Sequence, residues 1–143
     1  MNRRRHWEAE LTRFVANNRD RRHKWGEWDC ILMASSAIEA MTGTDPAAEY
    51  RGRYDDERGA AQALRDIGEG TLVKTIDAQL ERTPVSMARR GDLVEVKGSI
   101  GVCIGGVAVF VGEERFAENA GIAPRQGLVT IPRTEWVRAW KVG

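Results

Sequence analysis

The segment Trp25-Gly26-Glu27-Trp28-Asp29-Cys30 holds the residues best suited to chemistry, because it places a thiol directly after an acidic residue at the expected start of a helix. Unpaired backbone amides and the positive end of the helix dipole favour a thiolate there, and cysteines at helix N-termini can have lowered pKa values. The carboxylate of Asp29 opposes this effect. A cysteine on the apolar side of a helix is also commonly a small buried hydrophobic residue. The pattern therefore leaves two interpretations of Cys30, a nucleophile or a core residue.

A cysteine nucleophile needs a base, and the sequence contains two histidines, His6 and His23. His23 precedes Cys30 by seven residues, in the loop that leads to the same helix, so it is a candidate base. The alternative is a solvated histidine among the basic residues of that loop. The two cysteines lack the spacing of a zinc site, and we interpret the acidic run at residues 55–57 as a helix start. We therefore expect no metal and no cofactor.

Apolar residues recur at helical spacing in the first half of the chain. They predict one helix over about residues 4–18 and a second that begins at Cys30. Asp29 is a suitable N-cap for the second helix, and Gly43 is a suitable C-terminal stop. Two shorter helices are expected around residues 60–67 and 72–80.

The second half contains short runs rich in β-branched and aromatic residues, separated by glycine: GDLVEV, IGVCI, VAVFV, LVTIP and WVRAWKV. Such runs are typical of an antiparallel meander, with Gly105-Gly106 as a hairpin turn. Trp136 and Trp140 are expected on one face of the last strand. Helices followed by strands indicate an α+β fold. We predict a single domain over residues 1–143, with a helical part at about 4–81 and a β part at about 91–142.

The composition is that of a globular domain, with 143 residues, 42% hydrophobic and 30% charged residues. No apolar run reaches the roughly 18–20 residues of a membrane span, and the N-terminus lacks the apolar region of a secretory signal. The net charge is +1 (22 − 21), but residues 1–24 carry an excess of +5 (8 − 3). Because these basic residues are not interleaved with aromatic ones, we interpret them as a solvated helix surface and do not expect a nucleic-acid partner.

Three motifs together resemble the NlpC-type branch of the papain-like cysteine peptidases: Asp29-Cys30, Gly91-Asp92-Leu93-Val94, and Ile100-Gly101-Val102-Cys103-Ile104-Gly105-Gly106. Members of that branch cut peptide bonds in bacterial cell-wall peptidoglycan. The resemblance implies a papain-like fold, with helices packed on a curled antiparallel sheet and Cys30 at the position of the nucleophile. Ser99 then stands where the family has its histidine. Because serine accepts no proton near neutral pH, the resemblance implies a catalytically degenerate site.

A narrower set of motifs is similar to small NlpC-like proteins encoded among the tail genes of phages and prophages: Trp25-x-x-x-Asp29-Cys30, Met41-Thr42-Gly43-x-Asp45-Pro46-Ala47, Arg51-Gly52-x-Tyr54, and Ala139-Trp140-Lys141-Val142. This similarity implies a structural or adaptor part of a phage tail tip, made in the host cytoplasm and located in the virion. Its partners would be the tail hub and neighbouring tail subunits. The alternative is an active peptidase or amidase that cleaves peptidoglycan during phage entry and binds its peptide.

Aromatic and arginine side chains suit the centre of protein interfaces. The sequence offers a group of these residues near the cysteine. We predict the following partner contacts: Trp25, Trp28, Tyr50, Arg51, Arg53 and Tyr54.

Overall fold

The fold is α+β, as the sequence predicts, and the computed structural model describes residues 1–114 and 123–143. The helices are α1 (Trp7–Asn18), α2 (Cys30–Thr42), α3 (Glu57–Asp66) and α4 (Leu72–Asp77). The strands are β1 (Arg82–Thr83), β2 (Leu93–Val96), β3 (Ser99–Cys103), β4 (Val107–Glu114), β5 (Arg125–Pro132) and β6 (Arg138–Trp140). Two short 3-10 helices are η1 (Val85–Met87) and η3 (Arg133–Glu135).

The strands form one antiparallel sheet in the order β1-β6-β2-β3-β4-β5. Strands β2 to β5 form the predicted meander. The last strand departs from the prediction, because β6 returns to the far side of β2 instead of lying beside β5. Strand β1 precedes residue 91, where we expected the β part to begin. Its two residues are too few to show an alternating pattern in the sequence.

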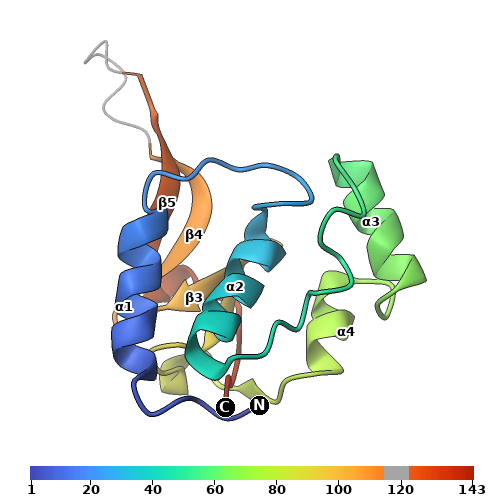
Figure 1. Cartoon of the computed structure of the whole chain (residues 1–143). Helices are drawn as coiled ribbons and strands as arrows, with labels where there is room; N and C mark the ends of the chain where they lie inside the picture. The colour runs from blue at the N-terminus through green and yellow to red at the C-terminus, as the bar shows by residue number, and fades with distance from the viewer. Residues whose placement is uncertain (115–122) are drawn as a thin grey trace.

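Helix α2 is the central helix, and it contacts α1 and strands β3 and β4. Its two ends are as predicted: the side chain of Asp29 accepts a hydrogen bond from the Leu32 amide, and Gly43 ends the helix with a φ of 83°. Seven residues of α2 are buried, and they lie on more than one side of the helix. Figure 1 shows α1 and α2 side by side on one face of the sheet, with α3 and α4 beyond α2.

The opposite face of the sheet carries a second apolar cluster around Val94, Cys103 and Phe110. The segment around η1 and the side chain of Trp136 cover it, instead of a long helix. This corrects the expectation for the two tryptophans, because Trp136 belongs to this cluster and Trp140 to the core on the α2 side. Trp136 precedes β6, so strand alternation does not relate the two residues.

The first residues of the chain are part of the packed structure, which corrects the interpretation of residues 1–24 as a wholly solvated surface. Arg3 is largely buried and pairs with Asp92 at 2.8 Å. It also donates to the carbonyl oxygens of Val142 and Arg90, both at 2.6 Å. These bonds hold the two ends of the chain together, and Figure 1 shows N and C side by side. Within the described residues, no helix is long and apolar enough to cross a membrane.

Candidate functional site

Cys30 begins α2 and is partly exposed at the edge of a cavity. Burial raises the pKa of its thiol above the ordinary value; hydrogen bonding with the backbone of Ile100 opposes this shift, and the charge of Asp29 adds to it. The desolvation of the sulfur therefore outweighs the stabilisation that a helix N-terminus gives to a thiolate. A raised pKa leaves less thiolate at neutral pH than an ordinary cysteine has, which weakens Cys30 as a nucleophile.

The loop before Cys30 is held by the buried carboxylate of Asp29. Its Oδ1 accepts from the Leu32 amide at 3.0 Å, and its Oδ2 accepts from the Gly26 amide at 3.2 Å. The hydroxyl of Tyr54 also donates to Oδ2, at 2.5 Å. Gly26 has a φ of 79°, and a Cβ there would lie 1.9 Å from the carbonyl oxygen of Tyr54. This close approach explains the glycine between the two tryptophans.

The structure shows the surroundings of Ser99, which stands where the family has its histidine, and of the candidate base His23. Ile100, whose backbone lies at the sulfur, packs in the core on the α2 side. Adjacent strand residues point to opposite faces, so the exposed side chain of Ser99 belongs to the other face of β3. His23 is exposed, and its ring makes an edge contact with the ring of Trp25, with centroids 4.7 Å apart. Among the described residues, no histidine hydrogen-bonds to Cys30.

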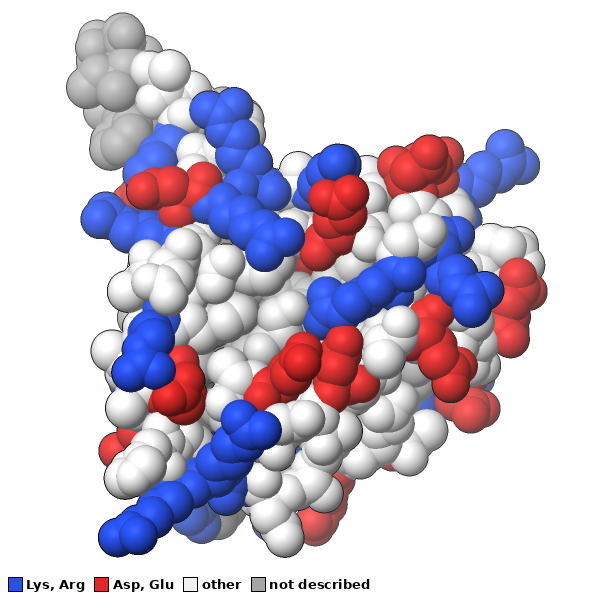
Figure 2. Space-filling model, viewed as in Figure 1, with Lys and Arg blue, Asp and Glu red and all other residues white. Residues whose placement is uncertain are grey.

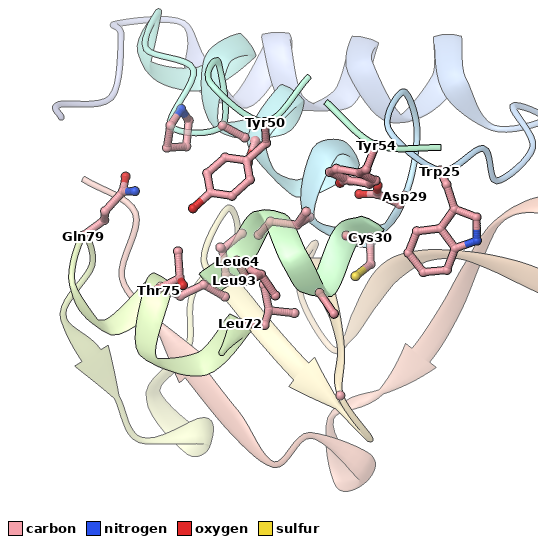
Figure 3. A pocket seen from close by; sticks show the side chains of 18 of the residues that line it. Trp25, Asp29, Cys30, Tyr50, Tyr54, Leu64, Leu72, Thr75, Gln79 and Leu93 are labelled. Carbon is pink, nitrogen blue, oxygen red and sulfur yellow. The ribbon is translucent and has the colours of Figure 1, made fainter. Parts of the chain in front are cut away.

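A cavity of about 280 Å³ extends from Cys30 along α2, between this helix and the α3–α4 pair. Its lining is mainly apolar and includes Ile31, Ile38, Leu64, Leu72, Ile76 and Leu93. In Figure 3, Trp25 and Cys30 lie at one end of the cavity and Gln79 at the other. Cavities of this kind typically bind apolar groups that a few polar atoms orient. The cavity has no direct signature in the sequence, because its walls come from helices α2, α3 and α4, strand β2 and the connecting loops.

A second hollow, of about 310 Å³, adjoins the first and shares Pro46, Tyr50, Thr75 and Gln79 with it. Three acidic residues line this hollow: Asp45, Glu49 and Glu69. Asp45 is paired with Arg51, whose Nε lies 2.6 Å from Oδ2. Burial alone would raise the pKa of Asp45, but the hydrogen bonds from Arg51 and the Ala47 amide, with the charge of Arg51, lower it overall.

The six predicted partner-contact residues lie in different surroundings. Trp28 is 1% exposed and packs against Phe14, so it contributes to the core of this chain. Tyr50 lines both hollows, while Arg51 and Tyr54 are joined to other residues of the chain. Trp25 is partly exposed and Arg53 is exposed. Contact with a partner stays a prediction, for which Trp25 and Arg53 have the accessible side chains.

The surface around the site carries both signs of charge. In Figure 2, lysine and arginine side chains gather over the loop that follows α1 and the neighbouring β4–β5 region. Two of them form ion pairs: Lys24 with Glu27, and Arg125 with Asp20 and Glu114. Within residues 1–114 and 123–143, no group of three or more His, Cys, Asp or Glu is arranged to hold a metal ion.

Two functional features were missed by the sequence analysis. One is the bond between Tyr54 and Asp29, although both residues occur in the motifs quoted above. The other is the set of bonds made by Asp92, the second residue of the GDLV motif. Asp92 is buried and accepts hydrogen bonds from Arg3 and from the amides of Arg89 and Val142. Both features join residues far apart in the chain, which spacing alone does not reveal.

Comparison with known families identifies one match. The chain matches the DUF6950 family, described as a domain of unknown function, over residues 2–142. The match spans nearly the whole chain, so the protein belongs to this family. No curated protein matches it.

Proposed function

We propose that the protein is a catalytically degenerate NlpC-like domain that serves as a structural or adaptor component of a phage tail tip. The proposal depends mainly on the surroundings of Cys30. This cysteine begins the central helix, and no histidine of the described residues is hydrogen-bonded to it. Burial also raises the pKa of its thiol. A thiol needs a base that takes its proton and holds the thiolate, and such a base typically contributes about 10²–10⁴ in rate. An enzyme of this kind would lose most of its activity without it.

The papain-like character of the domain is part of this proposal. A helix that begins at a cysteine and packs against an antiparallel sheet supports it. The GDLV motif also agrees with it, because Leu93 begins β2, which lies inside the sheet between β6 and β3. The phage setting rests on the motif resemblance alone, and with it the location in the virion and the tail hub and subunits as partners.

The first test is the reactivity of the two thiols. At pH 7.5, we expect iodoacetamide to label Cys30 slowly, because the raised pKa leaves little thiolate, and buried Cys103 even more slowly. The labelling rate of Cys30 should rise with pH up to and beyond 9. Mass spectrometry of tryptic peptides after timed quenching gives both rates, and the Cys103→Ser variant isolates the rate of Cys30. Fast labelling of Cys30 that levels off below pH 7 would contradict the proposal.

The second test concerns activity and location. Purified protein should release no labelled peptide from peptidoglycan beyond the amount released by the Cys30→Ala variant. Mass spectrometry of purified particles should detect the protein in tails, and a deletion of its gene should give particles with defective tail tips. A soluble, particle-free protein would overturn the tail assignment but not the lack of catalysis.

One observation favours the alternative, an active peptidase or amidase acting on peptidoglycan. The imidazole of His23 lies against Trp25, and Trp25 lines the same cavity as Cys30. For catalysis, this exposed loop would have to carry the imidazole to the thiol. That alternative predicts peptide release that both Cys30→Ala and His23→Ala abolish, with an apparent pKa near that of histidine in the rate profile.

A further inference from the structure

The cavity beside α2 has the size and lining of a site for one large apolar side chain. Its volume is about 280 Å³, and no lysine or arginine of the described residues lines it. An apolar cavity of about 150 Å³ is enough to bind benzene. The cavity therefore has room for a side chain as large as that of tryptophan. An apolar side chain that enters the cavity leaves water and gains contacts with the cavity walls. Both effects favour its binding.

The adjoining hollow adds a preference for positive charge. Glu49 and Glu69 line it, and within the described residues neither carboxylate takes part in an ion pair. Both carboxylates are close enough to Tyr50 to affect its hydroxyl electrostatically. Because the two hollows share Tyr50, Thr75 and Gln79, one occupant can reach both. Because the second hollow is acidic, it favours an occupant that carries a cationic group next to its apolar side chain.

Tyr50 lines both hollows, and its hydroxyl group forms no hydrogen bond within the described residues. The residue is 9% exposed, and no hydrogen bond joins its hydroxyl to any described residue. Figure 3 shows this hydroxyl directed across the cavity toward Thr75. A Cβ at Gly68 would lie 2.5 Å from the hydroxyl oxygen and 2.6 Å from Oγ1 of Thr75, so the glycine keeps the space beside both atoms. A hydroxyl that keeps contact with solvent and has no hydrogen-bond partner in the described residues is available to a ligand.

We propose that the two hollows form a peptide-docking site, which takes a segment of a partner protein that presents one large apolar side chain next to a lysine or arginine. The apolar side chain fills the cavity beside Cys30. The cationic side chain lies near Glu49 and Glu69, and the Tyr50 hydroxyl bonds to the peptide backbone between them. This inference rests on the proposed adaptor function and names the chemistry of the partner.

The test uses three short probes and the isotope-labelled full chain, followed by NMR titration. The first probe is N-acetyl-tryptophyl-lysine amide, and its comparators replace lysine with glutamate or tryptophan with alanine. We expect the first probe to shift the amide signals of Tyr50, Thr75 and Gln79 in a saturable manner. Its affinity should exceed that of the glutamate probe about threefold to fivefold and that of the alanine probe about tenfold or more. Equal affinities, or shifts confined to other surfaces, would overturn the proposal.

Three variants assign the binding to the named groups. Ala60→Leu places bulk in the cavity and should abolish binding. Tyr50→Phe removes only a hydroxyl that has no partner in the chain, so it should weaken binding about threefold while the urea unfolding midpoint stays unchanged. The double variant Glu49→Gln/Glu69→Gln should bind the lysine and glutamate probes equally. The matched control, Glu8→Gln/Glu135→Gln, changes the same number of charges at exposed residues outside both hollows and should keep the preference for lysine.

The outcomes separate this inference from the proposed function. Failure of the probes to bind, together with an unreactive Cys30 and no peptide release, overturns the docking site alone. Release of peptides from peptidoglycan overturns the adaptor function, whatever the probes do. Binding of the probes to a protein that lacks hydrolytic activity supports both proposals.

Discussion

The helices on the two sides of the cavity differ in how they are built into the molecule. Helix α2 buries seven residues and packs on α1 and on the sheet. Helix α3 buries Ala63 alone, and α4 buries Thr75 and Ile76. The cavity lies between these regions. Because buried apolar area supplies most of the stability, we infer that α2 and the sheet hold the fold, while the α3–α4 side keeps unfilled volume that a ligand can use.

The largest expected difference in stability lies between substitutions at the N-caps of α2 and α3. Asp29 is buried and accepts three hydrogen bonds, whereas Asp56 caps α3 at the surface and accepts from the Gly59 amide at 2.6 Å. Asp29→Ala should lower the free energy of unfolding by about 2–4 kcal/mol, since it removes a cap and leaves buried donors unpaired. Asp56→Ala should lower it by about 1 kcal/mol. Urea titration at pH 7 measures both. Equal losses would mean that the two sides of the cavity contribute equally.

The next difference is in how well α2 and α3 tolerate a larger side chain in place of an alanine. Ala37 of α2 is completely buried in the core, so Ala37→Leu should cost about 1–3 kcal/mol through overpacking. Ala60 of α3 lines the cavity, and Ala60→Leu has free volume beside it. We expect its cost to be below about 0.5 kcal/mol, measured by the same urea titration. A large loss in Ala60→Leu would show that the cavity closes in solution.

The smallest expected effect tests how α4 is attached to the sheet. Asp77 accepts two hydrogen bonds from Arg82 and one from the indole of Trp140 at 2.9 Å. The bonds from Arg82 and then Trp140 lower the pKa of Asp77 to about 2. A carboxyl group whose folded-state pKa is lowered stabilises the fold above its ordinary pKa, and this contribution is lost as the pH falls toward 2.

Asp77→Asn should therefore lower the urea midpoint slightly at pH 7, and the difference from the native chain should shrink between about pH 4 and pH 2. The native chain and Asp77→Asn are compared in parallel titrations at each pH. A difference independent of pH would indicate that the indole bond of Trp140 alone attaches α4. In that case Arg82→Gln should leave the midpoint unchanged.

The elements along the chain were predictable, because each has local markers. Asp29 and Gly43 mark the ends of α2 correctly, and the glycine-separated runs give the positions of β2 to β5. The place of β6 was not predictable from the spacing of its residues, since which edge a strand joins is decided by packing between distant segments. The helical spacing of apolar residues predicts α2 but not the extent of its burial, because its seven buried residues lie on more than one side of the helix.

The candidate site was predictable only in part. The sequence indicates Cys30 and its cap, because a local motif carries them. It does not indicate how burial shifts the pKa of the thiol, which depends on how the chain packs around the sulfur and on the backbone of Ile100 in β3. The unpaired hydroxyl of Tyr50 and the space kept by Gly68 also need coordinates, because they are properties of distances between elements.

The raised pKa of the Cys30 thiol has a consequence for handling the protein in air. Peroxide reacts with thiolates far better than with thiols, so a sulfur held as a thiol resists conversion to sulfenic acid. Cys103 lies in the cluster on the opposite face of the sheet, away from Cys30. Cys30 is therefore expected to oxidise more slowly than an ordinary exposed cysteine when a purified sample is stored without a reductant.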